Sequence, residues 1–178
     1  MRNAVILCYG DSNTYGYDPR GYFGGRYDAP WPELLGELTG FEVRNNGSCG
    51  REIPRRQVVF PGNADLILVM LGTNDLLQGA SPETAGERMA AFLATLDREK
   101  VLLLSPPPMV RGEWVSSDAL VEASRALARV YRSVAEELGV RFLDTAPWSI
   151  PMAYDGVHLT EEGHRIFAER LREELIHA

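Results

Sequence analysis

The sequence is poor in the residues on which basic, disulfide-linked and membrane-spanning proteins depend. Of its 178 residues, two are cysteine and three are histidine, and Lys100 is the only lysine. No apolar run approaches the roughly 20 residues that cross a bilayer, and residues 1–3 lack the pattern of a signal peptide. The formal net charge is −7, which disfavours nucleic acid and anionic membranes as main partners. We therefore expect a cytoplasmic protein that binds neither, and leave open whether a leader preceded Met1.

The few cysteines and histidines also bear on metals and redox chemistry. Cys8 and Cys49 do not form a Cys-x-x-Cys pair, which favours two free thiols in a reducing compartment. The sequence shows no histidine–cysteine cluster of the kind that holds zinc. We expect no metal and no cofactor.

The apolar segments that are present predict an α/β fold. Hydrophobic residues make up 45% of the chain and its length suits one domain over residues 1–178. Buried strands are expected at residues 4–9, 41–45, 66–71, 101–105 and 141–144. Helices are expected between and after them, at residues 32–38, 81–96, 117 or 118 to 138, and 160–176. This alternation predicts a three-layer α/β/α flavodoxin-like sandwich whose five-stranded parallel sheet has the order 2-1-3-4-5.

Residues suited to chemistry follow the expected strands. Ser12 follows the first strand, in the segment Gly-Asp-Ser-Asn at positions 10–13, where a tight turn can hold its hydroxyl exposed. Gly50 follows the second strand, Asn74 the third, and Asp155 and His158 the fifth. Ligands of open parallel sheets bind beyond the carboxyl ends of the strands. We therefore expect these residues to gather along one edge of the sheet.

Asp155 and His158 suit the activation of a serine nucleophile. A histidine that acts as general base needs one ring nitrogen free and the other held by an acceptor, and a carboxylate three residues earlier can supply that acceptor. The alternative is an ordinary Asp-Gly turn before a helix cap, as Gly-Asp-Ser is also ordinary turn chemistry. Taken alone, each segment leaves both interpretations open. Together with Asn74 they favour catalysis.

Attack on a carbonyl creates a negative oxygen that needs donors fixed in advance. The amide of Asn74 can be one donor, and the backbone N–H groups of Ser12 and Gly50 can be the others. A glycine lets the backbone approach closely, although Gly47 is a rival to Gly50 for this part.

These segments, in this order, resemble the four signature blocks of the GDSL family, also called SGNH hydrolases. They are Gly-Asp-Ser at 10–12, Gly50, Gly-Thr-Asn-Asp at 72–75 and Asp-Gly-Val-His at 155–158, and they span nearly the whole chain. The resemblance implies a flavodoxin-like fold and serine hydrolysis of esters. It also implies that Ser12 is the nucleophile, that Asp155 and His158 complete the triad, and that Gly50 and Asn74 complete the oxyanion hole.

A narrower resemblance is to the bacterial arylesterase and acyltransferase branch of that family. It is carried by the segments at 6–12, 70–75, 104–108 and 128–131. Members of that branch cleave short acyl esters, and some transfer the acyl group to alcohols or peroxide. The chain departs from the pattern at Asn13, where many relatives have an apolar residue. Its loops also look shorter than those of that branch, which leaves a homo-oligomer open.

Aromatic and apolar residues around these segments are candidates for the walls of a substrate pocket. Residues 14–31 form a long loop rich in glycine and aromatics, and long loops without secondary structure are often functional. For any single aromatic, packing in the core or in a subunit interface is the favoured interpretation. The candidate substrate-binding residues are Asn13, Tyr15, Pro107, Trp114, Trp148 and Tyr154.

The sequence thus predicts a serine esterase that hydrolyses, or transfers, short acyl groups of small-molecule carboxylic esters through an acyl-enzyme on Ser12. A carbohydrate O-acetylesterase would use the same residues, with the aromatics stacking on sugar rings. A non-catalytic binding protein on the same fold is the alternative from another class.

Overall fold

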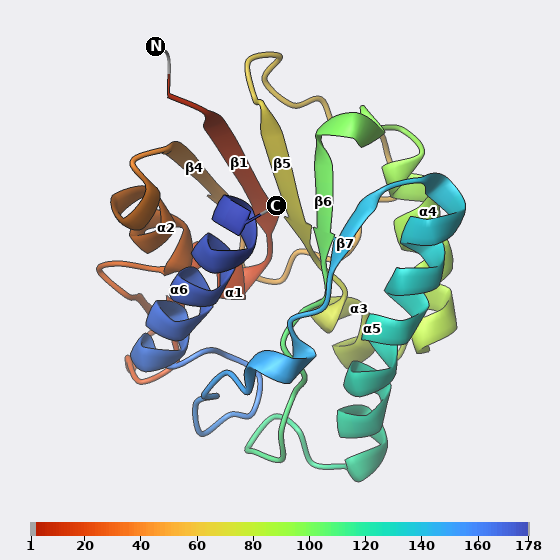
Figure 1. Ribbon diagram of the computed structural model, residues 1–178. Coiled ribbons are helices and arrows are strands. Elements are labelled where there is room, and N and C mark those ends of the chain that lie inside the picture. Colours follow the sequence, from red (N-terminus) through yellow and green to blue (C-terminus); the bar gives the residue numbers. More distant parts are fainter. Residues whose placement is uncertain (1–2, 178) are drawn as a thin grey trace.

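The central element is a parallel sheet of five strands in the order β4-β1-β5-β6-β7 (Figure 1). The computed structural model describes residues 3–177. The strands are β1 (Val5–Gly10), β4 (Glu42–Gly47), β5 (Leu66–Met70), β6 (Val101–Leu104) and β7 (Arg141–Leu143). Numbered along the chain among themselves, they have the order 2-1-3-4-5, so the predicted flavodoxin-like topology is confirmed.

Helices cover both faces of this sheet. On one face lie α2 (Trp31–Thr39) and α6 (Glu161–His177), and on the other lie α4 (Pro82–Leu93) and α5 (Asp118–Leu138) (Figure 1). Alternate residues of the strands feed two apolar clusters, one on each face. In the cluster under α2 and α6, Trp31 and Phe167 pack with ring centroids 4.9 Å apart. The cluster under α4 and α5 contains Met89 and Tyr131. Burial on both faces is why the central strands β1, β5 and β6 are apolar at nearly every position.

The main helices begin where the sequence predicts. Ser81 accepts a hydrogen bond from the Thr84 N–H, and Ser117 accepts one from Leu120. The hydroxyl of Thr160 accepts the Gly163 N–H at 2.9 Å ahead of the last helix. Each bond satisfies a donor that the first turn of a helix leaves unpaired.

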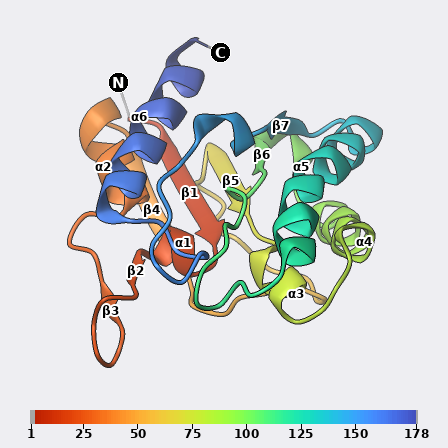
Figure 2. The same ribbon diagram turned by 90° about the horizontal axis from the view of Figure 1, so that it is seen from below.

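Several short elements, most of them at the carboxyl edge of the sheet, are absent from the sequence-based prediction. They are α1 (Ser12–Tyr15), α3 (Thr73–Leu77), the two-residue strands β2 (Tyr17–Asp18) and β3 (Gly25–Arg26), and the 3-10 turns η1 (Arg98–Lys100) and η2 (Ala146–Trp148). Seen from below, α1 lies at the end of β1 and α3 follows the end of β5 (Figure 2). The β2–β3 hairpin projects from the same side of the molecule. Elements of two to five residues are too short to produce a periodic pattern, which explains why the sequence does not reveal them.

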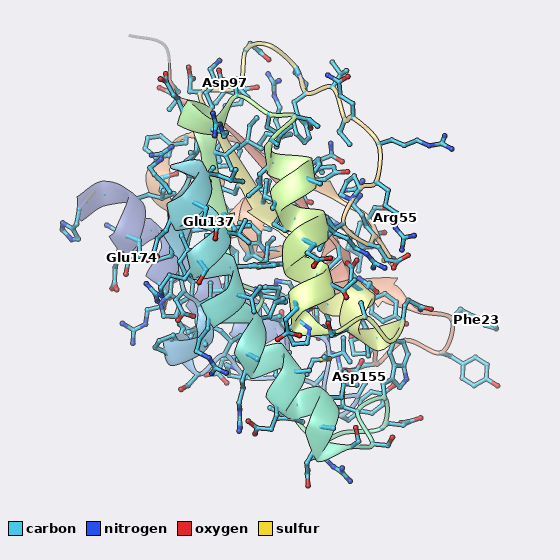
Figure 3. The ribbon with its side chains drawn as sticks, turned by 90° about the vertical axis from the view of Figure 1, so that its right-hand side faces the viewer. Phe23, Arg55, Asp97, Glu137, Asp155 and Glu174 are labelled. Carbon is cyan, nitrogen blue, oxygen red and sulfur yellow. The ribbon has the colours of Figure 1, made fainter. Side chains whose placement is uncertain are left out.

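The hairpin is the most protruding part of the molecule. Phe23 at its tip is 95% exposed and points away from the body, whereas Asp155 lies within it (Figure 3). Among residues 3–177, no helix combines the length and the apolar character that crossing a membrane requires.

Candidate active site

A continuous chain of hydrogen bonds joins a serine, a histidine and an aspartate at the carboxyl edge of the sheet. The hydroxyl oxygen of Ser12 lies 3.0 Å from Nε2 of His158. Nδ1 of the same ring lies 2.6 Å from Oδ2 of Asp155. The three side chains come from opposite ends of the chain and are all buried, with Asp155 fully so. A serine, a base and an orienting acid in this order are the parts of an activated nucleophile.

The loop 155–158 holds its carboxylate through its own backbone. Oδ1 of Asp155 accepts the N–H groups of Val157 at 2.8 Å and His158 at 3.0 Å, which leaves Oδ2 to the imidazole. Gly156 has a φ of 82°, and a Cβ there would meet the Val110 carbonyl oxygen, so the turn requires glycine. Burial alone would raise the pKa of Asp155, but the bonds from the His158 ring and the two N–H groups outweigh burial and lower this pKa. The carboxylate is therefore ionised when it faces the imidazole.

Ser12 is the first residue of α1, and the residue before it caps that helix. Oδ1 of Asp11 accepts the Asn13 N–H at 2.9 Å. A Cβ at Gly10 would lie 2.0 Å from the hydroxyl of Thr14, so only glycine allows the strand to enter the helix this closely. Burial raises the pKa of Asp11 to about 6, although the Asn13 N–H and the charges of His158 and Arg51 oppose the shift.

Asn13 joins the nucleophile to the loop of the base. Its Nδ2 donates to the Val157 carbonyl at 2.9 Å, and its Oδ1 accepts the Leu159 N–H at 2.9 Å. The side chain is buried and both ends of its amide are used. The polar atoms of Asn13 therefore bridge the Ser12 segment and the His158 loop, and Asn13 is not among the residues that line the cavity described below; its contact with substrate stays a prediction.

Three donors surround the space next to the Ser12 hydroxyl. The Gly47 N–H is taken by Oδ1 of Asn45 at 2.9 Å, which removes Gly47 as a rival donor. Within residues 3–177, the N–H groups of Ser12 and Gly50 have no protein acceptor. Gly50 has a φ of 75° and open space where a Cβ would stand. With the Nδ2 group of Asn74, these amides suit the stabilisation of an oxyanion.

A cavity of about 300 Å³ opens onto these groups. Two aromatic rings border the imidazole of His158, with centroids at 4.6 Å for Tyr17 and 5.4 Å for Trp114. Trp114 is 52% exposed, so the cavity has an aromatic rim that reaches the surface. The lining residues are Ser12, Tyr17, Cys49, Gly50, Asn74, Trp114 and His158.

Known proteins resemble this chain in sequence and in fold. The model of the GDSL-like lipase/acylhydrolase family matches residues 8–166. The chain belongs to this family. The matched range includes Ser12, Gly50, Asn74, Asp155 and His158.

Individual relatives of this GDSL-like protein fall into two groups by name. The native aryl esterase of M. smegmatis has a TM-score of 0.83 and 25% identity, with 98% of this chain and 99% of that chain covered. A carbohydrate acetylesterase family member from Sinorhizobium meliloti has a TM-score of 0.79 and 27% identity, with 97% of each chain covered. An acetylxylan esterase from Xylanibacter ruminicola is 22% identical over an alignment of 204 positions. The alignment covers 92% of this chain. The match spans only 41% of the length of that curated relative.

Not all the predicted pocket residues of this GDSL-like protein lie at the cavity. Trp114 does. Trp148 instead packs on Phe167 in the core beneath α6, with ring centroids 5.1 Å apart. Pro107 is buried and is not among the residues that line the cavity. Tyr15 is not among them either, and its ring lies 5.3 Å from the guanidinium of Arg26. The hydroxyl of Tyr154 donates to the Pro19 carbonyl at 2.9 Å, and its ring lines a different hollow.

The cavity also contains residues that the sequence analysis did not propose. Tyr17 lies in the long loop already noted for its aromatics, but no periodicity tells which of those rings turns inward. Cys49 precedes Gly50, and its exposed thiol forms part of the wall. Burial raises the pKa of the Cys49 thiol, aided by the charge of Asp11, so the thiol is not activated as a nucleophile.

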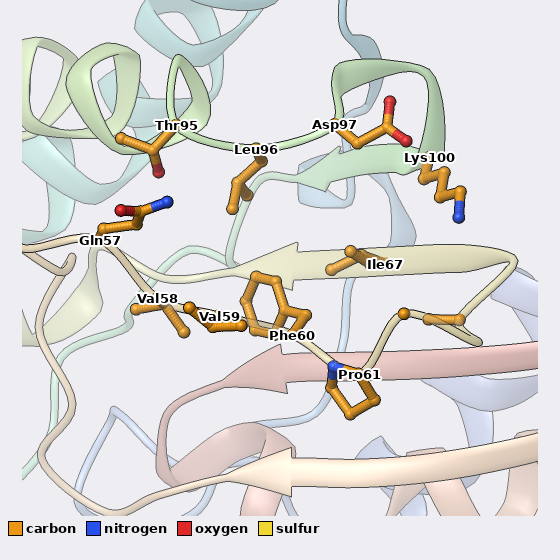
Figure 4. A pocket seen from close by; sticks show the side chains of 12 residues that line it. Gln57, Val58, Val59, Phe60, Pro61, Ile67, Thr95, Leu96, Asp97 and Lys100 are labelled. Atoms are coloured by element: carbon orange, nitrogen blue, oxygen red, sulfur yellow. The ribbon is translucent and has the colours of Figure 1, made fainter.

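A second hollow, of about 290 Å³, lies near the amino ends of β5 and β6 (Figure 4). Its walls are largely apolar, with residues such as Val58, Phe60 and Leu96, and its charged members are Asp97 and Lys100. The lining contains no histidine, serine or cysteine, so it has no counterpart of the Ser12–His158 pair. Among residues 3–177, no group of three or more histidine, cysteine, aspartate or glutamate side chains is placed to hold a metal ion.

Proposed function

We propose that this protein is a serine esterase that hydrolyses small-molecule carboxylic esters through an acyl-enzyme on Ser12. The observation that carries the proposal is the unbroken path from the Ser12 hydroxyl through His158 to Asp155, at 3.0 Å and 2.6 Å. Membership of the GDSL-like lipase/acylhydrolase family supports it. The free N–H groups of Ser12 and Gly50 beside the hydroxyl support it as well.

In the first half of the proposed reaction, the Ser12 oxygen bonds to the ester carbonyl carbon while its proton moves to Nε2 of His158. The ionised Asp155 stabilises the imidazolium that results. The carbonyl oxygen becomes an oxyanion held by the amides of Ser12, Gly50 and Asn74. When the tetrahedral intermediate collapses, the carbon–oxygen bond to the alcohol breaks and His158 gives its proton to the leaving alcohol.

In the second half, a water molecule replaces the alcohol. His158 takes a proton from this water, whose oxygen bonds to the acyl carbon, and the same donors hold the second oxyanion. Collapse returns the proton to Ser12 and releases the carboxylic acid. An alcohol in place of water would yield acyl transfer with no change in the protein groups.

Hydrolysis of aryl acetate, butyrate and octanoate esters tests the proposal. Ser12→Ala is expected to abolish activity, whereas Ser48→Ala, which changes an exposed serine near the cavity, is the matched control and should retain it. A fluorophosphonate probe should label the wild type and not Ser12→Ala. Equal hydrolysis by wild type and Ser12→Ala, or a probe that leaves Ser12 unlabelled, would support a non-catalytic binding protein instead.

Removal of O-acetyl groups from carbohydrate is a second candidate. The aromatic rim formed by Tyr17 and the half-exposed Trp114 favours it, since such rings stack on flat sugar faces as well as on aryl groups. The names of the relatives from Sinorhizobium meliloti and Xylanibacter ruminicola point the same way. Comparison of kcat/KM on acetylated xylo-oligosaccharides and on aryl acetates distinguishes the two substrate classes.

We also propose that the protein acts in the cytoplasm. Cys8 and Cys49 are both free thiols, which suits a reducing compartment. Detection of the protein in the periplasmic or culture fraction of its host would contradict this assignment.

A further inference from the structure

The three oxyanion donors differ in one respect. The N–H groups of Ser12 and Gly50 have no protein acceptor within residues 3–177. The amide of Asn74 is occupied: its Nδ2 donates to the Arg51 carbonyl at 3.1 Å and to Oδ2 of Asp11 at 3.4 Å. An amide nitrogen has two protons, so it can donate to both of these protein oxygens at once.

The carboxylate of Asp11 is well fixed for this contact. It is 2% exposed, and its Oδ1 is committed to the Asn13 N–H at 2.9 Å. The remaining oxygen, Oδ2, is therefore directed at Asn74 by the same bond that caps α1. The Asn74 amide plane is held from one side by the backbone of residue 51 and from the other by Asp11.

We propose that Asp11 is a positioning residue that holds the Asn74 amide at the oxyanion hole and gives up one N–H to the oxyanion as it forms. This inference rests on the proposed esterase function. The bond at 3.4 Å is the longer and weaker of the two, so it is the one exchanged. The bond to the Arg51 carbonyl keeps the amide in its plane throughout.

The proposal gives Asp11 a part distinct from its capping bond. Preorganised donors are effective because they need no reorientation when charge develops. An Asn74 side chain without its Asp11 contact would have only the Arg51 carbonyl to fix its terminal torsion, so the third donor would be less well aligned before the oxyanion forms. Two charged groups face Asp11: His158 and Arg51, which both lower its pKa. The charge of Asp11 in turn adds to the effect of burial in raising the pKa of Cys49 and of Tyr131.

A double-mutant cycle separates positioning from general damage. Asp11→Asn keeps the size of the side chain and remains a good helix cap. The new side chain has one oxygen and one NH₂ group in place of two oxygens. Its NH₂ group must therefore face either the Asn74 amide or the Asn13 N–H, both of which are donors. We expect Asp11→Asn alone to lower kcat by roughly 10- to 100-fold, less than the loss of a whole oxyanion donor, with KM nearly unchanged. In an Asn74→Ala background, the same change should lower kcat by less than about 3-fold.

Equal losses in the two backgrounds would overturn the proposal, because a purely structural effect does not depend on Asn74. Full activity of Asp11→Asn would overturn it as well. If Asp11→Asn does not fold, Asp11→Ser enters the same cycle, since serine caps the helix but is too short to reach Asn74.

Side-chain amide NMR of Asn74 supplies a readout that does not depend on activity. The resonance is assigned by its loss in Asn74→Ala. We expect both Nδ2 protons to shift in Asp11→Asn, and unchanged shifts would contradict the contact. Loss of the proposed function would show itself differently, as equal hydrolysis by wild type and Ser12→Ala.

Discussion

Asn13→Leu tests the bridge between the nucleophile and the base. Leucine has the shape of asparagine and matches the apolar residue that many GDSL relatives have at this position. In this structure it would place methyl groups where Nδ2 and Oδ1 now lie, each 2.9 Å from a backbone atom. The Val157 carbonyl and the Leu159 N–H would lose their partners in a buried site.

The expected cost follows from these two orphaned groups. Each unsatisfied buried group costs about 1–3 kcal/mol, and burial of the leucine side chain returns about 1.5–3 kcal/mol. The net destabilisation is about 2 kcal/mol, which lowers the Tm of a domain this size by about 4–8 °C. The change also loosens Ser12 relative to His158, and a misplacement of about 1 Å at reacting groups can cost about 100-fold in rate. We therefore expect kcat to fall together with stability.

Urea unfolding, thermal unfolding and ester hydrolysis measure these effects. Asn63→Leu is the matched control: this exposed asparagine bonds Arg44 at the surface, and its replacement should change stability by less than about 0.5 kcal/mol. An unchanged or raised Tm for Asn13→Leu would refute the reasoning. It would mean that the loop 155–159 finds other partners for its backbone at no cost.

Two further predictions concern the oxyanion hole and acid stability. Asn74→Ala removes one donor, so kcat should fall by about 10²- to 10³-fold while KM and Tm change little. A rise in KM of comparable size would contradict the role of Asn74 as an oxyanion donor. Burial, with smaller effects of Arg26 and His158, lowers the pKa of His164 to about 3, below its unfolded value of about 6.5. The unfolded state therefore binds the extra proton first, and stability is lost as pH falls from about 6.5 towards 3, by up to about 1.4 kcal/mol per pH unit. Urea unfolding of His164→Gln between pH 4 and 8 should give a flatter profile than wild type, and parallel profiles would contradict this.

The sheet and the long helices are predictable because their signals are long and redundant. The apolar strands β1, β5 and β6 and the capped α5 each combine several residues that agree, and the observed bounds differ from the expected ones by a few residues. The extension of β4 to Gly47 has a local reason. Asn46 and Gly47 pair with Tyr9 and Gly10 of β1, although they carry no apolar side chain. Backbone pairing, which the side-chain pattern does not record, lengthens this strand.

The candidate catalytic residues are predictable for a topological reason, and the pocket walls are not. Segments that follow parallel strands meet at one edge, so the neighbouring strands β1 and β5 bring Ser12 and Asn74 together, and the loop after β7 carries His158 along the same edge to Ser12. The direction of an aromatic ring on a loop has no such constraint. Tyr17 and Trp114 turn toward His158, whereas Trp148 turns to the core, and each has the same kind of sequence around it.

The site is also held together in a way that sequence patterns do not reveal. Its polar side chains bond the backbone of neighbouring strand-end loops: Asn13 bonds the loop of His158, and Asn74 bonds residue 51. Asp75, fully buried and paired with Arg88 at 2.8 Å, accepts the Ile53 N–H at 3.0 Å and so fixes the segment that follows Gly50. Because these bonds run between loops and not along them, each donor and catalytic atom keeps its place without long secondary structure beneath it. Trp114 is tied to this set through its backbone, since its N–H donates to the Asp155 carbonyl at 3.0 Å. The rings of Tyr17 and Trp114 contact the imidazole only by packing, so side-chain substitutions there can alter the choice of ester while the reacting groups stay aligned.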